Sequence, residues 1–379
     1  MMQKKLIVVA LAAAIALPMP VLADNANVTV YGAVDMAFAV TNNGTSAAGV
    51  AGTSTNQVSS QVSKLGFKGS EDLGGGLSAI WQIEQQIDAD NTTLAASKNT
   101  FATRNSFGGL KSDSMGTVLL GRHDTPYKIA TRKLDVFGDS LADNRSLMGQ
   151  AGTHDARPTD VVAYISPAMS GFTAAAAYVA GAETATTSAQ VKGSAWSLAG
   201  MYDAGPVYAS LAYQAFDGGT LGTSSNQTLF DTTVGANNNL KAWKLGGGYT
   251  MEALQLNAVY EKTSSSIANV DTLGRTDWYL AGKYSFGSDA VKLAYAHAGE
   301  FGATAAAKAN TGASQLALGY DHNLSKRTTI YAQYTKLNNG TAASYKITNA
   351  GSTAGNFTLP GTGAGASPSA WALGMKHTF

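Results

Sequence analysis

The C-terminal segment, residues 369–379, alternates between two kinds of side chain. One face is mostly large and apolar and carries Trp371, Leu373, Met375, His377 and Phe379. The opposite face is small or polar and carries Ala370, Ala372, Gly374, Lys376 and Thr378. A period of two residues is that of a β-strand, and two unlike faces require two unlike surroundings. The pattern therefore predicts a strand with an apolar medium on one side and water on the other.

The same alternation recurs along the chain. In residues 28–40, one face carries Val28, Val30, Val34, Met36 and Phe38, and the other carries Thr29, Tyr31 and Asp35. Counting such segments predicts about sixteen strands of roughly ten residues each. Their ranges are 28–40, 63–70, 77–86, 100–110, 116–123, 158–166, 171–180, 193–203, 206–216, 240–250, 253–263, 275–286, 290–299, 313–323, 328–337 and 369–379.

The connections between these strands differ in length. Short turns occur at 204–205, 287–289 and 324–326, whereas 41–57, 217–239 and 338–368 are long and rich in Gly, Ser, Thr, Ala and Asn. Short turns and long loops are typical of a transmembrane barrel of antiparallel strands. Reading the long loops as linkers between domains is weaker, because no group of strands between them could close a core alone. We expect an all-β barrel in one domain, residues 24–379.

The N-terminus has the three parts of a signal peptide. Lys4 and Lys5 supply positive charge, residues 6–17 are apolar, and Val21-Leu22-Ala23 offers small residues for cleavage. The apolar run is too short for the roughly 20 residues of a membrane-spanning helix. We therefore expect residues 1–23 to be a signal peptide, cleaved after Ala23.

Composition agrees with an exported barrel. The chain has no cysteine, and 45% of its residues are hydrophobic while 13% are charged. Closing a sheet on itself pairs every backbone group and so stabilises the fold without disulfides. Without Lys4 and Lys5 the chain has 24 basic and 25 acidic residues, a balance that argues against nucleic acid as a partner.

One long connection, between Arg122 and Arg157, is charged rather than rich in Gly and Ser. Its charged residues are Asp124, Lys128, Arg132, Lys133, Asp135, Asp139, Asp143, Arg145 and Asp155. Long segments of this kind inside a compact domain are usually functional. This segment could fold into the lumen of the barrel.

Several segments resemble general porins of Gram-negative bacteria, most closely those of β-proteobacteria. They are Val30-Tyr31-Gly32-Ala33-Val34-Asp35, residues 63–74 (SKLGFKGSEDLG), residues 103–111 (TRNSFGGLK), Leu120-Gly121-Arg122 and the terminal Phe379. The resemblance follows the mature chain in order from end to end. It implies an outer-membrane barrel, a homotrimer, and a third loop that folds inward and narrows the pore between acidic and basic side chains.

The resemblance places the constriction on particular residues. The basic side falls on Lys64, Arg104 and Arg157, with Arg122 at the base of the loop, and the acidic side falls on Asp135 and Asp139, with Asp143 a weaker candidate. Two departures from the family are Lys64, where Arg is usual, and Val136-Phe137-Gly138-Asp139, where many relatives carry Pro-Glu-Phe. Alternation supports the placement. Lys64 falls on the strand face opposite to Leu65 and Phe67, and Arg104 on the face opposite to Phe107, so both basic side chains are expected to point into the lumen. A charged side chain on the lipid face of the barrel would destabilise the fold by roughly 2–4 kcal/mol at the middle of the membrane.

These features predict a passive channel for small hydrophilic solutes and ions across the outer membrane, with a weak preference for anions. The only other partners expected are membrane lipids and further copies of the chain. Two alternatives remain open: a substrate-specific channel, and a plugged barrel that acts as an adhesin or receptor.

No catalytic, cofactor or metal-binding site is expected, because the histidines lack metal-ligand spacing and no nucleophile motif occurs. Tyrosines recurring once per strand indicate girdles at the membrane interfaces: Tyr164, Tyr178, Tyr202, Tyr213, Tyr249, Tyr260, Tyr279, Tyr295 and Tyr320.

Overall fold

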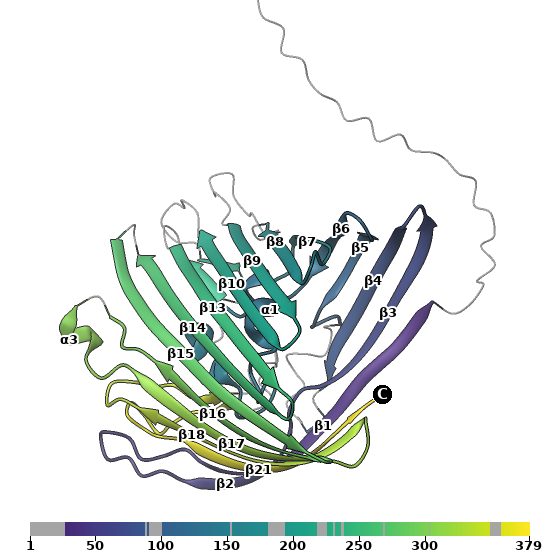
Figure 1. The fold of residues 1–379 in the computed structure, drawn as a ribbon. Helices are drawn as coiled ribbons and strands as arrows, with labels where there is room; N and C mark the ends of the chain where they lie inside the picture. Colours follow the sequence, from purple (N-terminus) through teal and green to yellow (C-terminus); the bar gives the residue numbers. More distant parts are fainter. Residues whose placement is uncertain are drawn as a thin grey trace, which may run out of the picture.

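The computed structural model describes residues 27–87, 89–90, 101–151, 154–180, 194–217, 226–229, 232–235, 239–267, 270–302, 304–348 and 358–379. In this part of the chain the strands form a closed antiparallel barrel of sixteen positions (Figure 1). The strands β2 and β3 share one position, because both pair with the same edge of β1. The last strand, β21, pairs with the other edge of β1 and closes the barrel.

The barrel strands are β1 (Val28–Asn42), β2 (Ser54–Ser60), β3 (Ser63–Gly74), β4 (Leu77–Ile87), β5 (Ser106–Ser112), β6 (Gly116–Arg122), β7 (Val161–Ile165), β8 (Phe172–Val179), β9 (Ser194–Ala204), β10 (Val207–Asp217), β13 (Asn239–Met251), β14 (Leu254–Ile267), β15 (Val270–Phe286), β16 (Asp289–Ala298), β17 (Ala313–Asn323), β18 (Thr328–Asn339) and β21 (Ser369–Thr378). Outside the barrel sheet lie the short pairs β11 (Asn226–Leu229) with β12 (Thr232–Gly235), and β19 (Ile347–Thr348) with β20 (Thr358–Leu359). The helical segments are α1 (Pro126–Arg132), η1 (Asn144–Ser146), α2 (Met148–Ala151) and α3 (Ala305–Lys308).

The sixteen predicted strands are confirmed, and most of their ends shift by at most four residues. The larger differences are β5, which begins six residues later than predicted, and β15, which begins five residues earlier. Loop regions hold more structure than expected, since β2 begins inside 41–57 and the β11–β12 pair lies inside 217–239. The predicted signal peptide, residues 1–23, lies outside the described residues. None of the described helices is long and apolar enough to cross a membrane.

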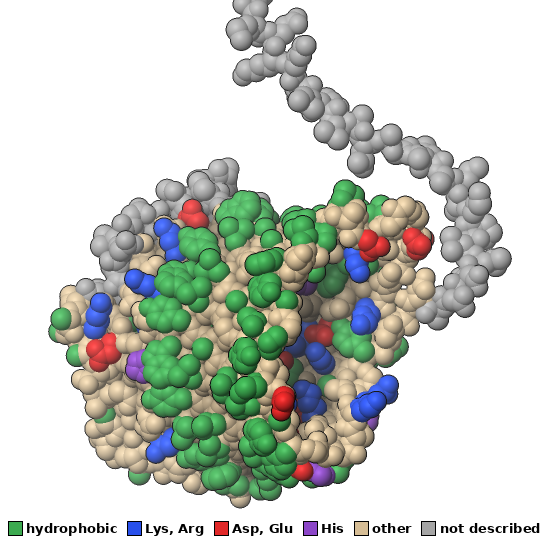
Figure 2. Space-filling model, in the orientation of Figure 1, with side chains coloured by type: hydrophobic (Ala, Val, Ile, Leu, Met, Phe, Trp, Pro, Cys, Tyr) green, Lys and Arg blue, Asp and Glu red, His purple; other side chains and the backbone are tan. Residues whose placement is uncertain are grey.

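The two faces of the strands differ as the alternation predicts. In β1, Val34 and Phe38 are 43% and 49% exposed on the outer wall, while Asp35 on the inner wall is 4% exposed. Figure 2 shows the outer wall covered with hydrophobic side chains and charged side chains inside the hollow of the barrel. The barrel therefore presents hydrocarbon to its outside and polar groups to its inside, which suits a membrane protein with an aqueous lumen.

The largest apolar cluster lies between the wall and the connection of residues 123–160, hereafter the inward loop. Leu134, Phe137, Leu141 and Leu147 of the loop are at most 2% exposed and pack against inner-wall residues such as Ala294. Each such side chain contributes roughly 1.5–3 kcal/mol when it leaves water. This packing fixes the loop inside the barrel, where Figure 1 shows α1 enclosed by the strands.

Candidate pore constriction

Local sequence explains why the inward loop begins as a helix. Thr125 is the N-cap of α1, and its hydroxyl accepts a hydrogen bond from the backbone N–H of Lys128 at 3.3 Å. Pro126 occupies the first turn, where its missing N–H is not needed. The helix therefore starts directly after the loop leaves β6 and carries the chain across the lumen.

Hydrogen bonds from the barrel wall hold one side of the loop. The Tyr127 hydroxyl donates to Glu261 Oε2 of β14 at 2.7 Å. Tyr208 of β10 donates to the Ala130 carbonyl at 2.6 Å, and Asn257 of β14 donates to the Leu134 carbonyl at 2.7 Å. Strands β10 and β14 therefore bind this face of the loop.

Two glycines of the wall make room for the loop. A Cβ on Gly246 of β13 would lie 2.7 Å from Leu134 Cδ1, and a Cβ on Gly319 of β17 would lie 2.6 Å from Phe137 Cε1. Side-chain carbons do not approach that closely without displacement. Both positions therefore require glycine for the loop to pack as it does.

On the facing wall, three side chains surround the Glu84 carboxylate of β4. Arg104 Nε donates to Glu84 Oε1 at 2.5 Å, and the Tyr31 hydroxyl donates to Oε2 at 3.0 Å. Lys64 Nζ lies 3.5 Å from Oε2, and the Lys64 side chain is 31% exposed. Two cations thus share one carboxylate, which leaves this part of the wall with net positive charge.

A second group of charges lies where the loop leaves and rejoins the wall. Arg157 Nε lies 3.0 Å from Asp124 Oδ1, and Lys128 Nζ lies 2.8 Å from the same oxygen. Burial raises the pKa of Asp124, but Lys128 and Arg157 outweigh it and hold that pKa well below its usual range. Burial lowers the pKa of Lys128 to about 7, although Asp124 opposes the shift. Arg122 Nη1 donates to the Arg157 carbonyl at 3.5 Å.

The tip of the loop holds two arginines and three carboxylates. Arg145 Nη2 lies 2.9 Å from Asp139 Oδ1 and 2.7 Å from Asp143 Oδ2, and Arg132 also pairs with Asp143. One third of the Asp139 side chain is exposed. Burial raises its pKa, but Arg132, Arg145 and then Arg104 lower it well below the usual range. Asp139 is therefore an anion that reaches lumen water and interacts with Arg104 of the facing wall.

Asp135 has a different setting from Asp139. Its carboxylate has no exposed surface and accepts hydrogen bonds from the Tyr279 hydroxyl at 2.8 Å and the Phe137 N–H at 2.9 Å. Burial, followed by the charge of Asp143, raises the pKa of Asp135. Asp135 joins the loop to β15 and does not face pore water.

The structure corrects two details of the prediction. Tyr279 does not belong to an interface girdle, because it is 1% exposed and binds Asp135 from inside the barrel. Phe107 also points inward, packing against the buried cluster that includes Ala156. Arg104 reaches the lumen because it precedes the first residue of β5, not because it alternates with Phe107.

Sequence reasoning named no acid on the basic side, yet the structure places Glu84 and Asp124 there. Alternation gave a signal for Glu84, because it shares the inner face of β4 with Gln86. Asp124 lies in an irregular segment, where no periodicity shows which residues meet. Among the described residues, no group of three or more His, Cys, Asp or Glu side chains is arranged to hold a metal ion.

The fold agrees with comparisons to known proteins. A family model described as Gram-negative porin matches residues 10–342. The chain is 30% identical to outer membrane porin protein 32 of Delftia acidovorans over 388 aligned positions, which cover 100% of both chains. It is 29% identical to major outer membrane protein P.IB of Neisseria sicca, covering 86% of this chain and 91% of that protein.

Solved structures show the same architecture. An anion-selective porin from Comamonas acidovorans superimposes with a TM-score of 0.72 and 26% identity, covering 93% of this chain and 99% of that one. OmpF of Salmonella typhi shares the fold with a TM-score of 0.63 at 16% identity. The protein is an outer-membrane β-barrel that belongs to the family of Gram-negative porins.

Proposed function

We propose that this porin lets small hydrophilic solutes and ions diffuse passively across the outer membrane, with a weak preference for anions. The observation that carries the preference is the charge on the two sides of the lumen. The wall residues Lys64, Arg104 and Arg157, together with Lys128 at the start of the loop, are four basic side chains against two carboxylates, Glu84 and Asp124. Lys128, with a pKa of about 7, carries only part of its charge near neutral pH. The loop tip, with Arg132 and Arg145 against Asp135, Asp139 and Asp143, has two cations against three carboxylates.

The mechanism needs no catalytic group. The inward loop narrows the lumen, and the unequal charges on its two sides produce a transverse field. In a pore with low-dielectric walls, such charges decide which ions enter. Asp139 supplies the acidic side that faces water, whereas Asp135 holds the loop in place. Arg122 supports the base of the loop through the Arg157 carbonyl.

Single-channel recording in a planar bilayer under a salt gradient tests this function. An ohmic conductance with a reversal potential on the anion side is the expected result. Saturable flux of one solute would instead indicate a substrate-specific channel. A bilayer without conductance would contradict the proposal and indicate a plugged barrel that binds a partner.

Export and assembly are part of the same proposal. Cleavage after Ala23 would leave residues 24–379 as the mature chain, and the intact mass of the protein purified from outer membranes measures this directly. The resemblance to general porins supports a homotrimer. Conductance that appears in steps of three, together with the mass of the complex in detergent, is the expected result.

A further inference from the structure

A cavity of about 450 Å³, hereafter the mouth cavity, lies between long connections at one end of the barrel. It is lined by Ser146, Phe301, Thr311, residues 342–346 and Thr348. The connections after β16 and β18 leave these strands at the ends remote from the short turns at 287–288 and 324–327. In outer-membrane barrels the short turns are periplasmic and the long loops extracellular. The mouth cavity is therefore open to the outside of the cell, and its volume suits a small organic molecule.

The lining of the mouth cavity combines aromatic rings with polar groups. Phe301 and Tyr345 are half-buried, whereas Ser344 and Lys346 are exposed. None of the described residues forms an ion pair with Lys346 or a hydrogen bond with the Ser344 hydroxyl. The cavity therefore presents two rings together with a cation and a hydroxyl that the described part of the chain leaves without partners.

Hydrogen bonds hold both aromatic residues in place. Arg275 of β15 donates to the Tyr345 hydroxyl at 2.5 Å. The Asn339 side chain accepts from the Tyr345 N–H at 3.2 Å and donates to its carbonyl at 2.9 Å. Thr311 Oγ1 accepts from the Phe301 N–H at 2.9 Å. The two rings are thus fixed before a ligand arrives, which reduces the entropy lost on binding.

The mouth cavity also touches the tip of the inward loop. Ser146 Oγ donates to the Thr348 carbonyl at 3.3 Å and accepts from the Thr348 N–H at 3.2 Å, and both residues line the cavity. Ser146 directly follows Arg145, whose guanidinium pairs with Asp139. A molecule in the mouth cavity therefore lies beside the segment that narrows the pore.

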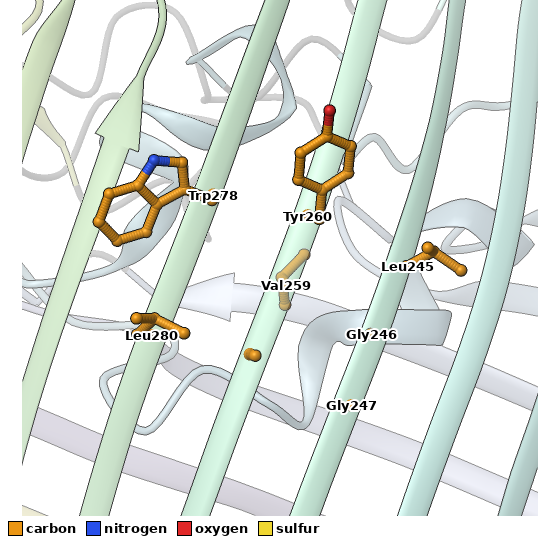
Figure 3. Close-up of a pocket in the computed structure, with 8 residues that line it drawn as sticks. Leu245, Gly246, Gly247, Val259, Tyr260, Trp278 and Leu280 are labelled. Atoms are coloured by element: carbon orange, nitrogen blue, oxygen red, sulfur yellow. The ribbon is translucent and has the colours of Figure 1, made fainter.

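A different hollow lies on the outer wall over β13, β14 and β15. Leu245, Tyr260, Trp278 and Leu280 surround it (Figure 3), and no charged side chain lines it. This hollow is outside the barrel, away from the path of solutes, and it offers nothing to an anion. Because its lining also suits an apolar ring, a test of the mouth cavity must distinguish the two places.

We propose that the mouth cavity binds a small aromatic carboxylate. Lys346 and the Ser344 hydroxyl bind the carboxylate, and the aromatic ring packs against Phe301 and Tyr345. An aliphatic anion would use the cation and leave both rings without a partner. The inference rests on the outer-membrane location, and it goes beyond the proposed channel function because this binding site lies outside the constriction.

The probe for the test is salicylate, a fluorescent aromatic carboxylate, titrated with the purified protein in detergent and followed by fluorescence anisotropy. Salicylamide has the same ring without the carboxylate charge. Lys346→Gln removes the cation, and its control Lys308→Gln removes an exposed lysine of α3 that does not line the mouth cavity. Phe301→Leu removes one ring, and its control Trp278→Leu removes a ring from the hollow of the outer wall.

Lys346→Gln should bind salicylate about fivefold more weakly than wild type, because an exposed ion pair contributes about this factor. Salicylamide should bind wild type with a similar loss. Phe301→Leu should also weaken binding about fivefold, because the contact between rings is lost, while both controls bind as wild type does. Wild-type affinity in Lys346→Gln or in Phe301→Leu would overturn the proposal, and so would a loss confined to Trp278→Leu.

Two further measurements keep the outcome clear. If Phe301→Leu yields no folded barrel, Ala342→Trp fills the mouth cavity from an exposed position and should abolish binding, so wild-type affinity in this variant would overturn the proposal. Glucuronate, an acid without an aromatic ring, should not displace salicylate, and displacement at equal concentration would refute the aromatic class of the ligand. Wild type without bilayer conductance would contradict the proposed channel function, whereas binding in detergent is measured independently of it.

Discussion

Substituting the two partners of one ion pair should change ion selectivity in opposite directions. Arg104 and Glu84 lie together on the wall that faces Asp139, with Arg104 Nε 2.5 Å from Glu84 Oε1. Arg104→Gln removes one positive charge from the wall, and Glu84→Gln removes one negative charge. Glutamine keeps much of the volume of both side chains, so the width of the pore changes little and the charge changes by one unit.

The size of the effect follows from Coulomb's law. A monovalent ion passing about 6 Å from the altered charge in water interacts with it by about 0.7 kcal/mol, and salt at 0.1 M screens this to about 0.4 kcal/mol. That energy changes the local concentration of each ion about twofold. Because anions and cations change oppositely, the permeability ratio should change about fourfold, toward cations in Arg104→Gln and toward anions in Glu84→Gln.

The assay is the reversal potential of single channels under a KCl gradient, with the open-channel conductance as a control for pore width. In 1 M salt the Debye length falls to about 3 Å, and the difference between the two variants should nearly vanish. Shifts of the same sign in both variants would refute the reasoning, since they would reflect pore geometry and not charge. So would an unchanged permeability ratio in both variants, which would place the constriction elsewhere.

Three further outcomes are expected. Gly319→Val places a Cβ against Phe137 and should displace the loop tip, which raises single-channel conductance. The control is Gly247→Leu on the outer face of β13, where a Cβ meets no atom within 4 Å, and its conductance should equal that of wild type. Equal conductance in wild type and both variants would contradict the packing of Phe137 against Gly319. Burial lowers the pKa of Lys128 to about 7, so this side chain should lose its charge as pH rises and the anion preference should fall between about pH 6 and 8. In Lys128→Arg the charge persists and the preference should stay constant. The same pH profile in wild type and variant would show that Lys128 does not contribute to the selectivity. Burial lowers the pKa of His154 from 6.5 to about 3, so the unfolded state binds more protons between these values and stability should fall as pH drops from about 6.5 toward 3. The midpoint of thermal unfolding should depend less on pH in His154→Phe than in wild type. An identical pH dependence in the two proteins would show that His154 is not the group responsible.

The faces of the barrel could be predicted because alternation is a local property. Whether Val34 faces lipid and Asp35 faces the lumen depends only on the two-residue period of a strand, and the structure agrees at both positions. Tyr279 could have been assigned by the same rule, because it lies between Trp278 and Leu280, which share the outer wall. Tyr279 was instead grouped with the girdle tyrosines because it is a tyrosine, without regard to the two-residue period of its strand.

Only the tertiary structure decided which charges meet. Asp135 and Tyr279 are 144 residues apart, and their contact depends on how the loop packs against β15. Arg104 and Asp124 lie in irregular segments where no period fixes the direction of a side chain. The sequence by itself therefore determined the barrel, its two faces and the position of a charged loop. Long-range packing decided which carboxylates remain in water and which hold the loop, because a buried charge is stable only beside partners that the folded chain brings to it.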